Sequence, residues 1–137
     1  MPVVDTSIIV SLMLNEPEAD AIRMWLATTI DLHAPDILPI EIANALINAQ
    51  RCNRLDADGA RSAFAELADL PIVLHPGELF LPRVLDICLL YQRRPYDALF
   101  VALAEQLEEP LFTGDLALVR GLAATPVGKW VKAIQTS

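Results

Sequence analysis

Short apolar runs alternate along the chain with longer stretches whose apolar positions recur every three or four residues. The short runs are typical of buried strands and lie at residues 2–5, 31–36, 71–75 and 109–115, with an expected edge strand at 127–134. The longer stretches predict helices at 6–14, 16–30, 35–55, 55–70, 77–94, 95–108 and 116–124. This alternation predicts an α/β protein, a three-layer α/β/α sandwich with a central parallel sheet and right-handed crossovers.

The composition fits one packed core. The chain has 137 residues, of which 54% are hydrophobic and 20% charged, so we expect a single domain over residues 1–137. No apolar run approaches the roughly 20 residues of a membrane helix, and the N-terminus lacks the basic start of a secretory signal. We therefore expect a cytoplasmic protein in which Cys52 and Cys88 are reduced and buried.

Four acids lie at unusual places in this pattern. Asp5 ends the first expected strand, and Asp115 follows the strand at 109–115 and opens a helix. Asp97 lies in the first turn of an otherwise apolar helix, and Glu41 lies early in its helix. Ligands of open parallel sheets bind beyond the carboxyl ends of the strands. The four carboxylates are therefore expected to converge at that edge.

Clustered carboxylates repel one another unless a cation or a proton is shared among them. Hard divalent cations such as Mg²⁺ and Mn²⁺ prefer oxygen ligands, activate water and stabilise charge on phosphate. An all-carboxylate set therefore favours phosphodiester chemistry. A plainer interpretation remains open for each acid, because Asp97 and Asp115 stand where acids commonly cap helices and Glu41 can belong to a solvated face. Asn44, one turn from Glu41, is a candidate to orient it.

The segments "VVDTSIIVSLML", "LPIEIANAL", "PYDALFVALAEQL" and "LFTGDLAL" resemble, in order and spacing, the four acidic motifs of the PIN-domain family. The resemblance covers nearly the whole chain and implies the same α/β/α fold. Small single-domain members of this family are typically VapC toxins of toxin–antitoxin pairs. The resemblance thus implies an endoribonuclease that depends on Mg²⁺ or Mn²⁺.

Carried over by position, Asp5 and Asp97 become direct metal ligands, and Glu41 and Asp115 complete the metal shell directly or through water. The resemblance also implies supporting roles for three hydroxyls, those of Thr6, Ser7 and Thr113, although turn and cap hydrogen bonding is an equal alternative. One departure is Leu116, which stands where family members often carry a basic or polar residue.

Arg93 and Arg94 precede Asp97 and are candidate contacts for an RNA phosphate, with a solvated loop as the alternative. A solvated helical face is expected for Arg51, Arg54 and Arg61. The remaining candidates are given structural roles, with His33 and His75 on or near strands and with Trp25, Tyr91 and Trp130 in the core or an interface.

The net charge of −8 opposes nucleic-acid binding in general, but the four site acids supply half of it and bound cations would offset that half. The resemblance implies an antitoxin partner with a basic inhibitory segment and a homodimer. Two other hypotheses stay open, a non-catalytic PIN-like binding module and a PIN nuclease that processes RNA outside any toxin–antitoxin pair. The motifs leave undetermined which RNA is cleaved and whether one metal ion or two are bound.

Overall fold

The protein is described by a computed structural model of residues 1–29 and 31–134. Its centre is a five-stranded, all-parallel sheet with the strand order β3-β2-β1-β4-β5. The strands are β1 (Val3–Val4), β2 (Leu32–Pro35), β3 (Ile72–His75), β4 (Leu111–Thr113) and β5 (Val131–Ala133). The predicted parallel sheet is confirmed, and β5 is the expected edge strand. The expected domain at 1–137 and the expected helix at 16–30 each include residues outside those described.

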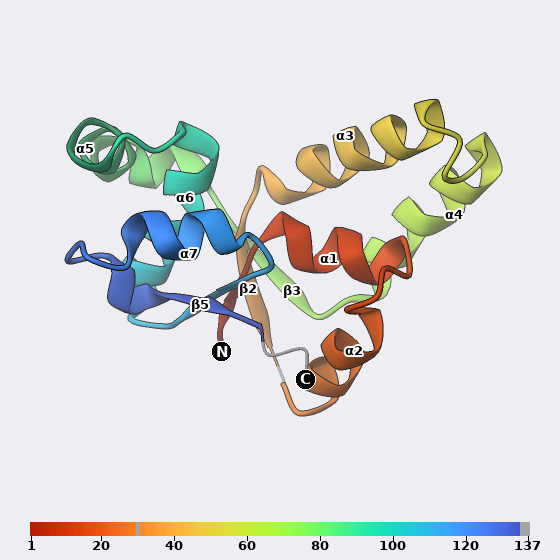
Figure 1. The fold of residues 1–137 in the computed structure, drawn as a ribbon, viewed down its shortest axis with the longest axis horizontal. Helices are drawn as coiled ribbons and strands as arrows, with labels where there is room; N and C mark the ends of the chain where they lie inside the picture. Colours follow the sequence, from red (N-terminus) through yellow and green to blue (C-terminus); the bar gives the residue numbers. More distant parts are fainter. Residues whose placement is uncertain (30, 135–137) are drawn as a thin grey trace.

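Seven α-helices in the described residues flank the sheet, as Figure 1 shows. They are α1 (Thr6–Met13), α2 (Ala19–Ala27), α3 (Leu38–Arg51), α4 (Ala57–Glu66), α5 (Leu81–Tyr91), α6 (Pro95–Leu107) and α7 (Leu116–Leu122). Short 3₁₀ turns lie at η1 (Leu67–Asp69), η2 (Gly77–Phe80) and η3 (Gly128–Trp130). In Figure 1, α3 and α4 form an arm that extends away from the sheet. The three-layer α/β/α sandwich predicted from the sequence is confirmed.

The connections cross the sheet in two directions. From β1 the chain proceeds through β2 to β3 on one side, and then returns across the sheet to β4 and β5 on the other side. Right-handed crossovers that run in opposite directions place their helices on opposite faces. Accordingly α6 packs across β2, β1 and β4, whereas α1 packs on β4 beside α2 and α3.

Helix α6 is the most deeply buried helix in the described part of the chain. Its residues 98–104 are all buried, and Val101, Leu103 and Ala104 have no exposed surface. A helix that is apolar on all sides is stable only inside a core. Pro95 begins this helix as predicted, and its fixed φ suits the first turn. The first turn of α6 is thereby held in place at the edge of the sheet.

The predicted helix caps agree in part with the structure. The carboxylate of Asp56 caps α4 by accepting a hydrogen bond from the Gly59 amide at 2.7 Å. The helix expected at 35–55 instead begins at Leu38 and ends at Arg51. The reason for the later start is that Asp36 is used across the sheet edge, where its Oδ1 accepts a hydrogen bond from the Gly77 amide at 3.0 Å.

The expected burial of the cysteines is wrong for Cys52. Both thiols are free, but α3 ends at Arg51, and Cys52 is exposed just beyond that end. Cys88 lies half-buried in α5, where burial raises the pKa of its thiol and the nearby negative charge of Asp97 adds to the increase. The aromatic residues agree with the expected core role, because Trp25, Tyr91 and Trp130 all pack against the core.

The two histidines, expected to be isolated, form a pair across adjacent strands. His33 Nδ1 and His75 Nε2 are 2.7 Å apart, and the His33 ring is buried. Its Nε2 has no protein hydrogen-bond partner within the described residues. Burial, and secondarily the neighbouring His33, lowers the pKa of His75 below its ordinary value of 6.5.

We expect His75 to contribute a loss of thermal stability as the pH falls below about 6.5. The unfolded chain then protonates His75, whereas the folded state resists protonation, so protons favour unfolding. Melting temperatures measured between about pH 8 and pH 5 test this. A His75→Gln variant should lose this part of the pH dependence, and an unchanged profile in that variant would contradict the prediction.

No helix within the described residues is long and apolar enough to cross a membrane.

Candidate functional site

The candidate site lies where the direction of strand progression reverses. Strands β1 and β4 are paired in the sheet, although their partners Val4 and Phe112 are 108 positions apart in the sequence. The chain leaves the two strands in opposite directions along the sheet. Such a switch point leaves a crevice beyond the carboxyl ends of the two strands. Asp5 directly follows β1, and Asp115 lies two residues beyond the end of β4. Both acids therefore lie at this crevice.

The buried hydroxyl of Thr113 connects the two acids. Thr113 Oγ1 donates to Asp5 Oδ2 at 2.6 Å and accepts from the Asp115 amide at 2.9 Å. Thr113 has no exposed surface, so this hydroxyl is fixed by the sheet. The Asp5 carboxylate is therefore held by the end of β4, a link that the sequence alone does not reveal.

Ser7 strengthens the same link from α1. Its Oγ donates to Asp5 Oδ2 at 3.2 Å, accepts from the Gly114 amide at 3.0 Å and lies 3.4 Å from Thr113 Oγ1. The side chains of Ser7 and Thr113 thus hold one oxygen of Asp5. The other carboxylate oxygen, Oδ1, receives no side-chain hydrogen bond among the described residues.

Glu41 is oriented by Thr6 and not by Asn44. Thr6 Oγ1 donates to Glu41 Oε1 at 2.7 Å, which links the first residue of α1 to the first turn of α3. Asn44 is exposed, and within the described residues no hydrogen bond joins it to Glu41. The expected orienting role of Asn44 is therefore wrong. Tertiary packing of α1 on α3 supplies the donor from a residue 35 positions away.

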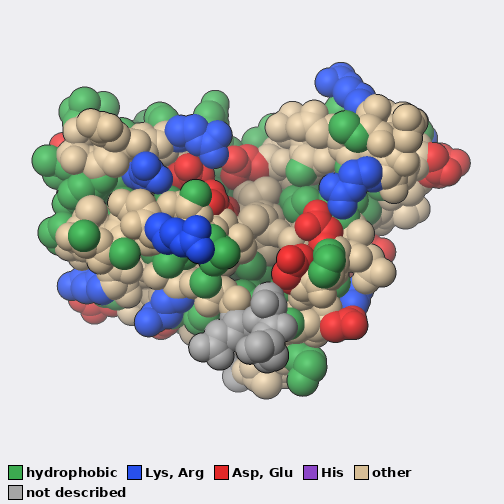
Figure 2. Space-filling model, in the orientation of Figure 1, with side chains coloured by type: hydrophobic (Ala, Val, Ile, Leu, Met, Phe, Trp, Pro, Cys, Tyr) green, Lys and Arg blue, Asp and Glu red, His purple; other side chains and the backbone are tan. Residues whose placement is uncertain are grey.

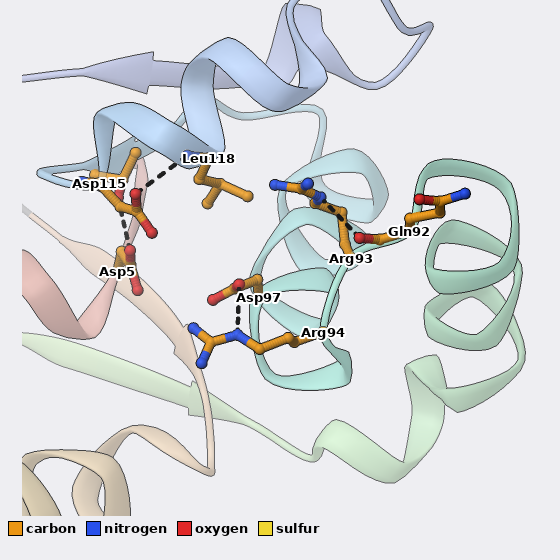
Figure 3. Close-up of polar contacts among 8 residues, drawn as sticks. Asp5, Gln92, Arg93, Arg94, Asp97, Asp115 and Leu118 are labelled. Carbon is orange, nitrogen blue, oxygen red and sulfur yellow. Dashed lines mark hydrogen bonds and ion pairs between the residues drawn. The ribbon is translucent and has the colours of Figure 1, made fainter.

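Asp97 enters the site from the opposite face of the sheet. It is the third residue of α6, and its Oδ2 lies 3.3 Å from Nε of Arg94. Figure 3 shows the side chains of Asp97 and Arg94 directed from α6 toward Asp5 and the end of β1. The site is therefore built from both layers of helices, with Asp5 between them.

The carboxylates influence one another electrostatically. Burial, above all, raises the pKa of Asp5, and the charge of Asp97 adds to the increase, while the hydrogen bonds from Thr113 and Ser7 oppose it. Burial also raises the pKa of Glu41, with further increases from Asp5 and Asp97. The Thr6 hydrogen bond and the charge of Arg94 oppose that increase. These three acids therefore share a region in which their negative charges disfavour one another.

Capping explains only one of the acids at helix starts. Asp115 caps α7 by accepting from the Leu118 amide at 3.1 Å, as the plainer interpretation predicted. Asp5 occupies the N-cap position of α1 but makes no cap hydrogen bond with its side chain. Asp97 is inside the first turn of α6, whose N-cap residue is Arg94. Capping therefore accounts for the position of Asp115 and not for those of Asp5 and Asp97.

The two adjacent arginines have different surroundings. The guanidinium of Arg93 lies against α7, where a Cβ on Gly121 would come within 2.7 Å of its Nη1. A larger residue at position 121 would displace the Arg93 side chain from this place. The side chain of Arg94 is 76% exposed and faces the acids. Arg51 and Arg61 lie on solvated helix surfaces as expected, because Arg51 is exposed on α3 and Arg61 forms an exposed ion pair with Asp58 on α4. Arg54 is also solvated, but it lies beyond the end of α3, where it pairs with Glu16.

The donor set fits a hard divalent cation. It offers carboxylate and hydroxyl oxygens and no sulfur or imidazole. Burial, and after it the neighbouring acids, raises the pKa of Asp5 and Glu41, so their ionised forms are disfavoured unless positive charge is supplied. Across residues 1–29 and 31–134, no three acidic, histidine or cysteine side chains are already gathered as a metal shell. Bare carboxylates repel one another, and a bound cation would remove that repulsion.

Figure 2 shows acidic side chains gathered at a hollow between the arm of α3 and α4 and the part of the molecule built by α5 to α7, with basic side chains at its edge. A separate pocket of about 420 Å³ opens beside the hydroxyls of Ser7 and Thr113. Leu116 belongs to the lining of this pocket, and none of the four acids does. The residue that departs from the family pattern therefore faces a neighbouring, more apolar surface.

Comparison with known proteins agrees with this architecture. The family model described as "PIN domain" matches residues 3–121. Ribonuclease VapC9 of Mycobacterium tuberculosis is 34% identical over 128 residues, which are 93% of this chain and 96% of the relative. Ribonuclease VapC1 of the same organism is 32% identical over 124 residues, covering 88% and 91%. Ribonuclease VapC3 of Pyrobaculum aerophilum is 29% identical over 124 residues, covering 89% and 95%.

A solved structure described as a toxin–antitoxin complex from Klebsiella pneumoniae shares the fold. The TM-score is 0.66 with 18% sequence identity, and the match covers 100% of each chain. The chain belongs to the PIN-domain family, and its relatives place it with the VapC members of that family.

Proposed function

We propose that this protein is a Mg²⁺- or Mn²⁺-dependent endoribonuclease and the toxin of a type II toxin–antitoxin pair. The observation that carries the proposal is that Asp5, Asp97 and Glu41 lie around the switch point between β1 and β4, near enough for their charges to act on one another, in a chain whose relatives are named ribonucleases. One PIN-like domain over residues 1–137 performs this role in the proposal.

In this proposal Asp5 and Asp97 hold the cation directly, and Glu41 and Asp115 complete its shell directly or through water. The hydroxyls of Thr6, Ser7 and Thr113 hold their acceptor oxygens still, because each donates to a site carboxylate. Fixed hydrogen bonds behind metal ligands orient them and so raise metal affinity. The oxygen of Asp5 that lacks these bonds is the one free to face a cation.

A bound Mg²⁺ or Mn²⁺ would neutralise the carboxylates, activate a water molecule as nucleophile and stabilise the negative charge of the reacting phosphate. The expected products carry 5′-phosphate and 3′-hydroxyl ends. The acids themselves would position the reacting groups around the cation.

The RNA phosphate is proposed to contact Arg94 at the edge of the hollow, and Arg93 less directly because its guanidinium lies on Gly121. The remaining negative surface suits a partner with positive charge. We therefore propose an antitoxin whose basic segment enters the acidic hollow and inhibits the enzyme. The solved relative described as a toxin–antitoxin complex is consistent with such a partner.

Self-association into a homodimer belongs to the same proposal. On α5 the side chains of Leu81, Leu85 and Leu89 are between 54% and 72% exposed and lie one helical turn apart. Exposed apolar strips of this kind favour association.

The proposed place of action is the cytoplasm, where RNA substrates are present.

Incubation of the purified protein with total RNA tests the proposal. Cleavage is expected with Mg²⁺ or Mn²⁺ and is expected to stop when EDTA removes the cation. Sequencing of the ends identifies the cut sites and the 5′-phosphate. The matched control is Asp69→Asn, which removes one exposed negative charge from η1, away from the site, and should cleave like the wild type. Absence of both metal binding and cleavage would favour a non-catalytic binding module instead.

A further inference from the structure

Arg94 occupies a position that its own helix does not favour. It is the N-cap residue of α6, in an extended conformation with φ −74° and ψ 146°, and it makes no cap hydrogen bond with its side chain. The N-terminus of a helix carries partial positive charge, so a cation there is electrostatically unfavourable. The contact that offsets this cost is the one to Asp97, at 3.3 Å between Nε and Oδ2.

The charge of Arg94 also acts on a second acid. It lowers the pKa of Glu41, which lies on α3, whereas the charges of Asp5 and Asp97 raise it. Within the described residues, Arg94 is the basic side chain that opposes the mutual repulsion of these carboxylates. The positive charge of Arg94 thus acts on Asp97 of α6 and on Glu41 of α3.

This contact is loose enough to be exchanged. The Arg94 side chain is 76% exposed, and it reaches Asp97 through a single long contact. By contrast, Arg83 binds Glu105 through two hydrogen bonds, with Nε at 2.7 Å and Nη2 at 3.0 Å. Exposed, single-contact ion pairs contribute little stability, whereas two-pronged arginine pairs are the strong ones.

We propose that Arg94 is a built-in counterion of the acidic site, which a divalent cation displaces from Asp97. This inference rests on the proposed function, because it takes the acids to be the metal ligands. In the metal-free protein the guanidinium balances Asp97 and Glu41. In the metal-loaded protein it turns to solvent, where an anionic phosphate can take the place of Asp97.

The displacement predicts that Arg94→Gln binds Mn²⁺ more tightly than the wild type does. The guanidinium of Arg94 repels the incoming cation and competes with it for Asp97, and the substitution removes both effects. At low ionic strength we expect about a fivefold lower dissociation constant. Calorimetric titration with Mn²⁺ alone, without RNA, measures it and does not depend on activity.

Two variants separate this role from a general effect of charge or folding. Arg94→Lys keeps the positive charge and should bind Mn²⁺ like the wild type. Arg93→Gln makes the same change in charge one residue away, at a guanidinium that lies on Gly121, and should change the affinity less than twofold. Melting curves of all variants verify that each is folded.

If the wild type binds Mn²⁺, and Arg94→Gln binds it no more tightly than Arg93→Gln, the inference is wrong while the proposed metal site stands. If neither the wild type nor Arg94→Gln binds Mn²⁺, the inference and the proposed function fail together. Tighter binding by Arg94→Gln alone, with wild-type affinity in Arg94→Lys, supports the inference.

Discussion

Replacement of Asp5 by asparagine is expected to lower metal-dependent RNA cleavage by a factor of about 10² to 10³, because a metal ligand is lost. The same change is expected to raise the thermal stability of the metal-free protein at neutral pH. The amide keeps the shape of the carboxylate and retains an oxygen that can accept from Thr113 and Ser7. The variant therefore removes charge while it preserves most of the local hydrogen bonding.

The sign of the stability effect follows from the raised pKa of Asp5. Burial, together with the charge of Asp97, disfavours the ionised carboxylate in the folded state. Protonation favours the folded state, so the contribution of Asp5 to stability is greatest below its ordinary pKa of 3.8 and is lost as the pH rises through the folded-state pKa. The gain from Asp5→Asn should therefore be largest near neutral pH and should shrink in acid.

Melting curves with and without Mn²⁺, together with cleavage assays, measure both effects. Added Mn²⁺ should raise the melting temperature of the wild type far more than that of Asp5→Asn, because ligand binding stabilises only the state that binds. The charge-matched control Asp69→Asn should keep both the cleavage rate and the response to Mn²⁺. Full cleavage by Asp5→Asn would rule out its proposed role as a metal ligand.

Replacement of Leu103 by alanine is expected to cost about 2–5 kcal/mol of unfolding free energy, the usual range for a fully buried leucine. Leu103 has no exposed surface and lies in α6, the helix that packs across β2, β1 and β4. The deletion leaves a cavity that the neighbouring strands cannot fill without movement. Because the same helix carries Asp97, a loosened α6 should also weaken binding of Mn²⁺.

Urea unfolding of Leu103→Ala and of Leu89→Ala measures this effect. Leu89 is 72% exposed on α5, so its replacement should change the stability by no more than about 0.5 kcal/mol. Equal losses in the two variants would mean that α6 is not the centre of the core, or that the α5 surface is covered by a second copy. Sedimentation of the wild type distinguishes these explanations.

Much of the fold could be predicted because its signals are local. Apolar residues predict burial directly from residue type. They mark the two strands that precede Asp5 and Asp115 and the largely apolar helix that begins at Pro95. Helix starts were predicted less well. The helix expected from residue 35 begins only at Leu38, because Asp36 binds the Gly77 amide, a contact that depends on where the loop after β3 lies.

The sequence predicted the acids of the site but not the residues that orient them. Residue type and position identified the four carboxylates, whereas the partner chosen for Glu41 was wrong because Thr6, on α1, is brought there only by packing. The histidine pair was missed for the same reason, since adjacency of β2 and β3 decides it. The proposed catalytic roles of the acids remain predictions.

The sequence by itself determined the alternation of strands and helices, the parallel sheet and the identity of the acids, because these depend on the apolar pattern and on residue type. Only the tertiary structure decided which hydroxyl holds which carboxylate, that Arg94 faces Asp97 while Arg93 lies on Gly121, and that Cys52 is exposed. Hydrogen bonds and burial act over a few ångströms in space, so residues far apart in the chain acquire them only when strand order and helix packing bring them together.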